Sequence, residues 1–253
     1  MKPSDNQLLV GIHAVASALK GAAADVEWVR LLANSKNKRL REIESRAHGS
    51  GVAVYKVGAA ELDRLSVQQR HQGVVAAFKG GNVTNESRLD SILDSIEGTP
   101  LILVLDGIQD PHNLGACLRT ADAAGAHLVV ICKDRSADIT PVVRRAACGA
   151  AETLPVIRAT NLARVLRKLK ERGIWLAGTS DEAGDELYAT DLTGPLALVM
   201  GSEGSGMRRL TSELCDYLVS IPMAGQVESL NVSVAAGVCL YEINRQRRLG
   251  QGA

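Results

Sequence analysis

Leu101-Ile-Leu-Val-Leu-Asp-Gly-Ile-Gln-Asp-Pro-His-Asn-Leu-Gly-Ala-Cys-Leu-Arg-Thr-Ala-Asp122 joins an unbroken apolar strand to a helix through a polar loop. The strand is expected over residues 101–105 and the helix over residues 113–124. A strand without a polar position is buried on both faces, which is typical of parallel sheets. The stretch therefore predicts one repeating unit of an α/β fold.

The same unit recurs along the rest of the chain. Apolar strands are predicted over residues 127–132, 153–157, 174–178, 196–200 and 217–221, and helices over residues 88–97, 140–148, 160–172, 206–214 and 229–248. Strands that alternate with helices form a parallel sheet with helices on both faces, so we expect an α/β domain over residues 88–253. Ligands bind such sheets at the carboxyl ends of the strands, which directs attention to the loops after Leu105, Met200 and Ile221.

The first 79 residues show a different order of predicted helices and strands. Helices are expected over residues 11–20, 36–48 and 59–65, and strands over residues 27–33, 52–57 and 73–79. They predict a small α/β domain, residues 1–79, followed by a turn-rich linker, residues 80–87. His13 and His71 precede apolar segments, and each either contacts a ligand or satisfies the backbone.

Composition narrows the class of protein. With 253 residues and 46% hydrophobic content, the chain can form a large core. No apolar run reaches the roughly 18 residues of a membrane helix, and the start, Met1-Lys-Pro-Ser-Asp5, has no apolar signal region, so we expect a cytoplasmic protein. The five cysteines never occur as C-x-x-C, which argues against a disulfide framework and against a metal site.

The formal net charge of +1 hides an uneven distribution. Residues 1–80 contain 12 Lys and Arg against 7 Asp and Glu, whereas residues 81–253 contain 17 against 21. A basic front part is either a solvated face or a module that contacts nucleic-acid phosphates. Because aromatic residues are only 3% of the chain, stacking of bases on aromatic side chains cannot be a large part of any RNA recognition.

The loop after Leu105 places an arginine where apolar residues dominate. Asp106, Pro111 and Asn113 suit a turn and a helix cap, which explains most of the loop but does not explain Arg119. Arg119 lies six residues into the helix among apolar neighbours, so we expect its charge to point toward the loop end or an interface. A buried arginine needs an anion, and phosphate suits its planar fork.

The loop after Met200 is glycine-rich. Gly201-Ser-Glu-Gly-Ser-Gly206 lacks the Lys-Ser/Thr of a P-loop, and Glu203 would repel a phosphate. The glycines are expected to let the backbone approach an uncharged or cationic ligand, with Glu203 as its polar partner or as a brace for Arg119.

The last loop enters the final helix through Ser229, Asn231 and Ser233. These side chains either cap the helix or help to hold a ligand at its free N–H groups, and one helix start does not decide between the two. The side chains singled out in the three loops are Asn, Arg, Glu and Ser, and this set includes no histidine, nucleophilic cysteine or metal cluster. That set argues against acyl transfer and metal-dependent hydrolysis, and it favours a reaction whose electrophile is already activated.

The three loops together resemble the motifs of a known family. Asn113-Leu-Gly-Ala-Cys-Leu-Arg119, Leu198-Val-Met-Gly-Ser-Glu-Gly204 and Ile221-Pro-Met-Ala-Gly-Gln-Val-Glu-Ser-Leu-Asn-Val-Ser-Val-Ala235 are similar to motifs 1, 2 and 3 of the SpoU (TrmH-type) RNA ribose 2′-O-methyltransferases. Gly11-Ile-His-Ala-Val15 and His71-Gln-Gly-Val74 resemble the small RNA-binding domain of bacterial members that methylate a guanosine ribose in large-subunit ribosomal RNA. The resemblance covers nearly the whole chain.

The resemblance implies a SPOUT-type fold with a C-terminal trefoil knot and a homodimer formed through the catalytic domain, in which the apolar final helix suits an isologous interface. It also implies that S-adenosylmethionine binds among the knot loops, largely through backbone groups. The cofactor-binding residues that it implies are Met200, Gly201, Ile221, Met223, Leu230 and Ser233.

By the same resemblance, the ribose 2′-oxygen attacks the sulfonium methyl in an in-line displacement. Asn113 and Arg119 are expected to act at the ribose and phosphate, Glu203 to orient them, and Ser229 and Asn231 to shape the loop. Arg119 is either the general base or, because a guanidinium normally stays protonated, a clamp on the 3′-phosphate that stabilises the developing alkoxide.

Two alternatives stay open from the sequence. The same reaction on transfer RNA would use the same motifs. A ribosomal RNA-binding assembly factor would keep the fold without the chemistry, although all three motifs are intact.

Overall fold

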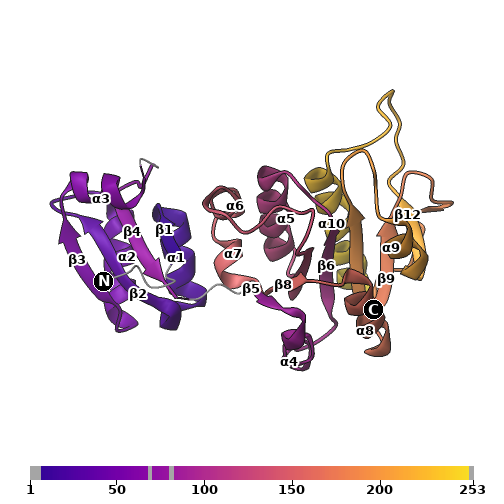
Figure 1. Ribbon diagram of the computed structural model, residues 1–253, viewed down its shortest axis with the longest axis horizontal. Helices are drawn as coiled ribbons and strands as arrows, with labels where there is room; N and C mark the ends of the chain where they lie inside the picture. Colours follow the sequence, from indigo (N-terminus) through magenta and orange to yellow (C-terminus); the bar gives the residue numbers. More distant parts are fainter. Residues whose placement is uncertain (1–6, 68–69, 80–82, 251–253) are drawn as a thin grey trace. The chain divides into compact units, whose positions relative to one another are not determined.

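The computed structural model describes residues 7–67, 70–79 and 83–250, and the chain divides into two compact units (Figure 1). The first unit comprises Met1–Asn82 with Arg144–Thr153, and the second comprises Val83–Val143 with Leu154–Ala253. Arg144–Thr153 therefore groups with residues that are far away in the sequence.

The first unit is built on a four-stranded sheet with strand order β1-β4-β2-β3. Its β2 and β3 are parallel, while β4 is antiparallel to both β1 and β2. The elements are β1 (Gln7–Val10), α1 (Ile12–Gly21), a 3₁₀ turn (Ala23–Asp25), β2 (Val26–Leu32), α2 (Lys38–Gly49), β3 (Ala53–Val57), α3 (Ala59–Leu65), β4 (Val74–Phe78) and α7 (Ala150–Thr153). Strand β1 was not predicted, because its four residues run directly into the helical pattern of α1.

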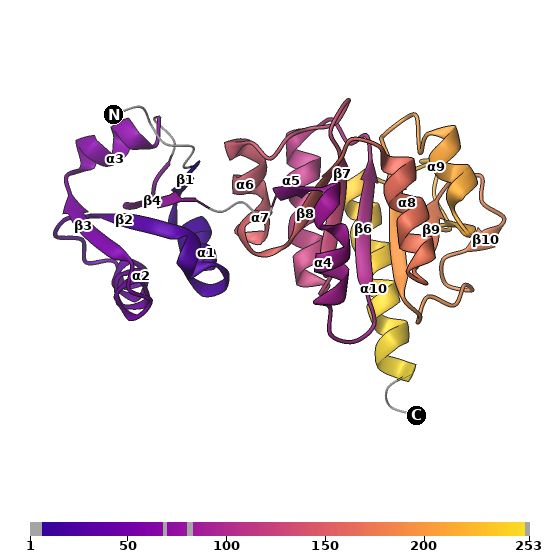
Figure 2. The same cartoon turned by 60° about the horizontal axis from the view of Figure 1, so that its bottom comes forward.

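Helices cover both faces of this small sheet. The larger core lies between the sheet and helices α1 and α2, and α3 packs on β2 and β4. Figure 2 shows α3 and the α1–α2 pair on opposite sides of the strands. The core includes Val15 and Leu19 of α1, Leu40 and Ile43 of α2, and Phe78 of β4.

The second unit contains an eight-stranded sheet with order β10-β12-β9-β11-β6-β7-β8-β5, and every neighbouring pair within the described residues is parallel. The predicted parallel α/β sheet is therefore confirmed. Its strands are β5 (Val83–Asn85), β6 (Leu101–Asp106), β7 (Leu128–Cys132), β8 (Val156–Ala159), β9 (Trp175–Thr179), β10 (Asp185–Glu186), β11 (Leu196–Gly201) and β12 (Tyr217–Ser220). The helical segments in sequence order are η2 (Glu86–Arg88), α4 (Leu89–Asp94), α5 (Pro111–Ala123), α8 (Leu162–Glu171), α9 (Arg209–Leu214) and α10 (Val232–Gly250). Helix α6 (Pro141–Ala147) begins in the second unit and ends in the first.

The large sheet is a middle layer between two layers of helices. One face carries a core to which α4 and α8 contribute, with residues of α9 packed against it. The other face is covered by α5 and α10, which pack on each other (Figures 1 and 2). Fully buried strands such as β6 and β7 explain why the sequence shows unbroken apolar runs there.

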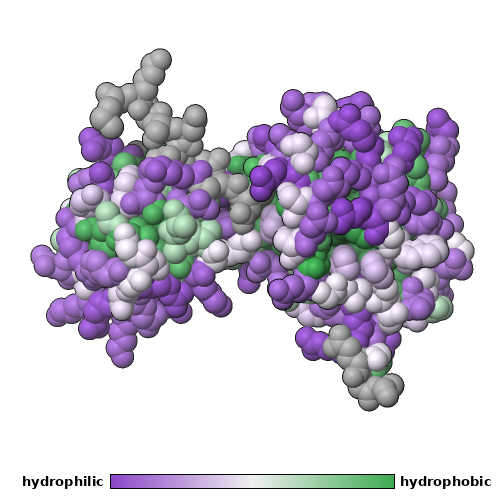
Figure 3. Space-filling model, turned by 90° about the horizontal axis from the view of Figure 1, so that it is seen from below, coloured by the Kyte–Doolittle hydropathy of each residue, from purple (hydrophilic) through white to green (hydrophobic). Residues whose placement is uncertain are grey.

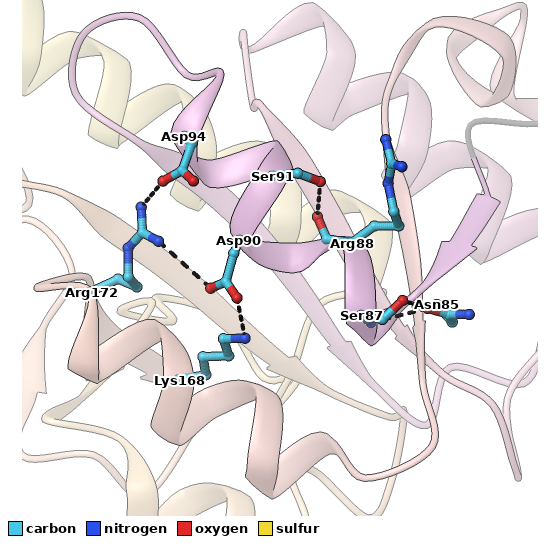
Figure 4. Close-up of polar contacts among 8 residues, drawn as sticks. All are labelled: Asn85, Ser87, Arg88, Asp90, Ser91, Asp94, Lys168 and Arg172. Carbon is cyan, nitrogen blue, oxygen red and sulfur yellow. Dashed lines mark hydrogen bonds and ion pairs between the residues drawn. The ribbon is translucent and has the colours of Figure 1, made fainter.

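A ladder of ion pairs joins the first helical segments of this unit to α8. Asp90 lies between Lys168 and Arg172, with an Asp90 Oδ1 to Arg172 Nη1 distance of 3.6 Å, and Arg172 also pairs with Asp94 (Figure 4). Arg164 pairs with Glu86 one turn earlier. The partners on each side recur every four residues, so two segments that run in the same direction present complementary charges to each other.

Arg247 binds the end of α10 to the loops at the amino-terminal ends of the sheet strands. Its guanidinium donates hydrogen bonds to the carbonyl oxygens of Thr99 at 3.1 Å, Pro100 at 2.8 Å and Gly194 at 2.6 Å. Burial lowers the pKa of this group. The contacts anchor the last turns of α10 at the loops that precede β6 and β11.

Among the boundaries that differ from the prediction, two fall in polar segments. The expected linker, residues 80–87, includes residues 80–82, which lie outside the described residues, but Val83–Asn85 form β5 and pair with β8. The helix expected over residues 229–248 begins at Val232. In both cases a polar segment takes its structure from distant partners that local composition does not reveal.

No helix within the described residues is long and apolar enough to cross a membrane. On the face drawn in Figure 3, hydrophobic residues occupy limited areas and hydrophilic residues surround them.

His127 makes the stability of the second unit depend on pH. The backbone N–H of Leu101 donates to His127 Nδ1 at 3.1 Å, so this nitrogen acts as an acceptor in the folded chain. Burial lowers the pKa of His127 below its usual value, and the charge of Arg247 acts in the same direction. The unfolded chain, with a histidine pKa of about 6.5, therefore takes up the proton first as pH falls.

We predict that the free energy of unfolding contains a contribution from His127 that is present above pH of about 6.5 and is lost as pH falls through the lower folded pKa. His127→Asn keeps an acceptor near the Nδ1 position and removes the titration. Chemical denaturation between neutral and mildly acidic pH should show a weaker pH dependence in this variant than in the wild type. Parallel pH curves for the two proteins would contradict the assignment.

Candidate active site

The three predicted loops converge where the strand order reverses. From β6 the chain continues through β7 and β8 on one side, and it returns to build β9, β11 and β12 on the other. Asp106 at the end of β6 is paired in register with Gly201 at the end of β11. Such a switch point is the usual ligand site of an open parallel sheet.

Asp106 joins the first loop to the second. Its buried carboxylate accepts a hydrogen bond from the backbone N–H of Arg208 at 2.9 Å, and the Arg208 guanidinium lies 3.4 Å away. Arg208 Nη1 is also 3.7 Å from the sulfur of Cys132 at the end of β7. The sequence assigned Asp106 only a possible turn role and did not single out Arg208, since their pairing spans 102 positions.

The first loop caps its helix with a different residue than expected. Asp110 is the N-cap of α5, accepts a hydrogen bond from His112 N at 2.9 Å, and is followed by Pro111 in the first helical turn. Asn113, which the sequence allowed as a cap, therefore lies inside the helix. Its side chain is available for contacts between loops.

The glycine-rich loop folds back on its own strand. Ser202 and Gly206 exchange backbone hydrogen bonds of 3.0 and 2.9 Å. A Cβ on Gly201 would lie 2.1 Å from the carbonyl carbon of Gly206 and 2.2 Å from the nitrogen of Met207. Glycine at this position is thus required by the crossing of the chain over itself, whereas the sequence suggested approach of a ligand.

Asn231 is the residue at which the third loop becomes α10. Its side-chain Oδ1 accepts hydrogen bonds from Ser233 N at 2.9 Å and from Ser233 Oγ at 2.6 Å. Asn231 therefore caps the helix, with Ser233 in its first turn. Ser229 is exposed and lies outside the helix, so it is not a cap.

Asn113, Glu203 and Asn231 form one hydrogen-bonded cluster, although they come from three motifs. Glu203 Oε1 accepts from Asn113 Nδ2 at 3.0 Å, from Asn231 Nδ2 at 2.6 Å and from Val232 N at 3.3 Å. Asn231 Nδ2 also donates to Asn113 Oδ1 at 3.0 Å. One carboxylate oxygen thus holds the starts of α5 and α10 at the end of β11.

The side-chain amides of Asn113 and Asn231 differ in how many hydrogen bonds they still have available. Asn231 uses its amide nitrogen toward Asn113 and Glu203, and its oxygen accepts twice from Ser233. A primary amide has two N–H donors and two acceptor positions, so Asn231 is saturated. Asn113 donates once and accepts once within the cluster, and retains one donor and one acceptor position.

Arg119 does not have the buried environment that its apolar neighbours suggested. It is exposed on α5. Six residues of α-helix correspond to a rotation of about 600° and a rise of about 9 Å, so Arg119 lies about 120° around the helix from Asn113. The need for a buried anion is therefore not supported, because the guanidinium is in contact with solvent.

The expected cofactor-binding residues lie along the ends of β11 and β12 and the loop that follows. Met200 is buried with 2% exposure, while Met223 is 36% exposed. Gly201, Ile221, Leu230 and Ser233 are half-buried. Residues 222–229 are all exposed, which leaves the backbone of this loop accessible.

The cysteine near the cluster is not a nucleophile. Burial raises the pKa of Cys117 to about 12, and the Glu203 carboxylate acts in the same direction. The side chain is therefore a thiol at neutral pH. No group of histidine, cysteine and acidic residues in the described part of the chain could hold a metal ion.

Comparison with known families shows to which family the chain belongs. The family described as "SpoU rRNA Methylase family" matches residues 100–241, more than half of the chain. The chain belongs to this family. A second family, described as "RNA 2′-O ribose methyltransferase substrate binding", matches residues 8–83 of this SpoU methylase.

Relatives of the SpoU methylase extend over both matched regions. It is 54% identical over 96% of its length to a Ralstonia nicotianae protein named 23S rRNA (guanosine-2′-O-)-methyltransferase RlmB, of which 97% is covered. A Haemophilus influenzae protein of the same name is 53% identical, with 96% and 98% of the two chains covered. The resemblance inferred from the sequence is confirmed.

Solved structures show the same architecture. The SpoU methyltransferase AviRb from Streptomyces viridochromogenes, in complex with AdoMet, matches 97% of this chain and 92% of its own with a TM-score of 0.79 and 28% identity. A TrmH/SpoU tRNA modifying enzyme from A. aeolicus covers only 66% of this chain and 85% of its own, with a TM-score of 0.55 and 31% identity.

Asn231→Asp tests the cluster without removing the helix cap. Aspartate caps as well as asparagine, but here it loses both N–H donors and places a second carboxylate beside Glu203. Two carboxylates about 4 Å apart repel each other by roughly 1–4 kcal/mol, which predicts about a ten-fold or larger loss of methyl transfer. Asn161→Asp is the matched control, because Asn161 caps α8 by accepting from Arg164 N at 3.1 Å. Equal activities of the two variants would contradict the role of the cluster.

Gly201→Ala tests the crossing of the chain over β11. The added Cβ meets backbone at 2.1 Å, so the turn must shift. We expect a loss of about 1–3 kcal/mol in the free energy of unfolding, which thermal denaturation measures as a lower Tm. Gly225→Ala is the control, because nothing lies within 4 Å of its Cβ position and we expect its Tm to stay near that of the wild type.

Proposed function

We propose that this SpoU methylase transfers the methyl group of S-adenosylmethionine to the 2′-hydroxyl of a guanosine ribose in 23S ribosomal RNA. The observation that carries the proposal is the 54% identity to a 23S rRNA (guanosine-2′-O-)-methyltransferase over nearly the full length of both chains. The assembled cluster of Asn113, Glu203 and Asn231 supports the chemistry. A cytoplasmic location follows from this substrate and is part of the proposal.

The loops around β11 and β12 fit S-adenosylmethionine. This cofactor, when bound, supplies a sulfonium methyl group that is already activated for displacement. The exposed loop over residues 222–229 offers backbone N–H and C=O groups, and Glu203 and Glu228 offer negative charge toward a sulfonium cation. Met200, Gly201, Ile221, Met223, Leu230 and Ser233 are the residues that we propose to hold it.

Asn113 is the member of the cluster that can reach the RNA. Glu203 and Asn231 fix the plane of its amide, and its remaining N–H is free to bind a ribose oxygen. Glu203 orients Asn113, while Asn231 positions Glu203 and the start of α10. Since the electrophile needs no activation, orientation of the ribose is the main contribution that these residues make.

Arg119 acts from the surface of α5. Its exposed position suits contact with an RNA phosphate, which favours the phosphate clamp over the general base. We propose that Arg119 binds the phosphate on the 3′ side of the target ribose and stabilises the negative charge that develops on the 2′-oxygen. Ser229 is exposed in the same loop as Glu228, and we propose that it shapes this loop at the target ribose.

The proposal includes a homodimer formed through the catalytic unit. Helix α10 packs on α5 on one side, yet Val234 is 51% exposed and Tyr241 is 55% exposed. These two residues are seven positions apart and therefore lie on one face of the helix. A self-complementary contact across a two-fold axis would cover that face. The trefoil knot implied by the family belongs to the same proposal, with residues 221–231 connecting β12 to α10, the helix that packs on α5.

The coverage of the relatives favours ribosomal RNA over transfer RNA. The two 23S rRNA enzymes above match 96% of this chain, whereas the tRNA modifying enzyme from A. aeolicus matches 66% of it. An assembly factor without catalysis is disfavoured, because both relatives that match the chain over nearly its full length are named methyltransferases.

Arg119→Ala tests the proposed chemistry. We expect methyl transfer to 23S ribosomal RNA to fall by at least about a hundred-fold, a range typical for loss of a group that stabilises developing charge. Binding of S-adenosylmethionine, measured by calorimetry, should persist because Arg119 is not among the residues proposed to hold the cofactor. Arg167→Ala, on α8, is the control for loss of an arginine on another helix of the same unit. Near-normal turnover of Arg119→Ala would rule out the clamp.

A further inference from the structure

The two carboxylate oxygens of Glu203 have different surroundings. Oε1 accepts three hydrogen bonds, from Asn113 Nδ2, Asn231 Nδ2 and Val232 N. Oε2 accepts none from the described residues, and the side chain belongs to an exposed residue. One end of the carboxylate is therefore held by the protein, while the other end is open to solvent.

The turn after β11 keeps this second oxygen accessible. Ser202 and Gly206 close the turn with backbone hydrogen bonds, and residues 203–205 between them are all exposed. The carboxylate cannot turn its free oxygen inward without breaking the contacts of Oε1 with the starts of α5 and α10. Oε2 is therefore available to a molecule that enters the site.

Asn113 brings the substrate next to this oxygen. Its Nδ2 donates one N–H to Glu203 Oε1 at 3.0 Å, and the second N–H of the same nitrogen is the one proposed above to bind a ribose oxygen. Two acceptors on one amide nitrogen lie about 5 Å apart. Oε2 belongs to the carboxylate at the first of these positions, so a ribose hydroxyl at the second position lies within its reach.

Methyl transfer to a hydroxyl needs a proton acceptor, and several groups near the site cannot serve as one. The guanidinium of Arg119 stays protonated. Cys117 is buried, and burial raises the pKa of its thiol to about 12. Asp106 is also buried, and its carboxylate is bound to the backbone N–H of Arg208.

His112 is the competing acceptor. It is exposed in the first turn of α5, directly before Asn113. Neighbouring positions on an α-helix differ in direction by about 100°, so the imidazole and the Asn113 amide lie on different faces of α5. Within the described residues, the side chain of His112 forms no hydrogen bond with the cluster of Asn113, Glu203 and Asn231.

We propose that Glu203 is a general base, which accepts the proton of the ribose 2′-hydroxyl on Oε2. The inference rests on the proposed function, and it adds a chemical role to a residue that also positions Asn113. As the 2′-oxygen bonds to the methyl carbon, its proton passes to Oε2, and the electron pair of the broken carbon–sulfur bond stays on sulfur. The exposed carboxyl group then releases the proton to solvent.

Glu203→Gln separates the general base from the positioning role. Three N–H donors face Oε1, so the oxygen of glutamine must take this position and its NH2 group, which accepts no proton, must take the position of Oε2. We expect kcat to fall about a hundred-fold or more. The KM for 23S ribosomal RNA, the calorimetric affinity for S-adenosylmethionine and the Tm should stay near those of the wild type.

Glu213→Gln is the matched control. It removes an exposed carboxylate from α9, where Glu213 pairs with Arg209 and contacts no residue of the cluster. Its kcat should equal that of the wild type. His112→Gln tests the competing acceptor, and its kcat should also stay near the wild-type value.

Chemical rescue of Glu203→Ala distinguishes proton transfer from a requirement for negative charge. Acetate and fluoroacetate are similar in size and equal in charge, but acetate is the stronger base. General base catalysis predicts that saturating acetate restores more activity than saturating fluoroacetate. Equal restoration by the two anions would show that the carboxylate supplies only charge, and it would overturn the inference.

The outcomes also separate this inference from the proposed function. If the wild-type protein methylates 23S ribosomal RNA and Glu203→Gln keeps nearly the same kcat, Glu203 is not the base and the function stands. A large loss of kcat in His112→Gln, with near-normal turnover of Glu203→Gln, would assign the proton to His112 instead. If the wild-type protein transfers no methyl group to this RNA, the proposed function fails and the general base fails with it.

Discussion

A single carboxylate oxygen connects the elements of the candidate site. Glu203 Oε1 accepts hydrogen bonds from a side chain on α5, from the residue that caps α10 and from the first backbone N–H of α10. Hydrogen bonds to an ionised acceptor are stronger than neutral ones, and this group can form them only if both helices start at the end of β11. The position of α10 on α5, and with it the packing of one whole face of the sheet, is consistent with this one contact point.

The contact also explains why the chain must turn so tightly after β11. Glu203 reaches the helices from a turn in which Ser202 and Gly206 bond to each other, and this turn crosses directly over Gly201. At the other end of this turn, Asp106 at the end of β6 accepts a hydrogen bond from the backbone N–H of Arg208 and thereby fixes the start of α9. Two carboxylates, one exposed and one buried, thus hold the same turn from opposite ends.

The sequence predicted the parts of the fold that depend on local pattern. Strands such as Leu101–Asp106 are buried on both faces, so their apolar runs are visible without any knowledge of their neighbours. Val83–Asn85 was read as a linker because a three-residue edge strand is defined only by its partner β8. The start of α10 at Val232 was misplaced for a similar reason, since the loop before it is as polar as a helix cap.

The candidate site was predictable to the extent that its residues follow strands. Parallel strands bring their carboxyl ends to one edge, so Asn113, Glu203 and Asn231 were expected near one another, and they bond directly. What the pattern could not supply is the direction of a side chain on a helix with mixed faces. Arg119 has apolar neighbours in sequence, yet the helical rotation carries it to solvent.

The exposure of Arg119 bears on how the site is completed. A guanidinium in solvent forms weak contacts unless a second surface excludes water around it. In the proposed clamp, the RNA phosphate would bring charge to Arg119 and would also bring its own hydration. A protein surface placed against α5 and α10 would remove water from one side of the same guanidinium, and the exposed Val234 and Tyr241 give that surface an apolar contact area on the adjoining helix. Dimerisation would then strengthen phosphate binding, because the removal of water lowers the local dielectric in which the two charges interact. By thermodynamic linkage, phosphate binding would favour dimerisation to the same extent.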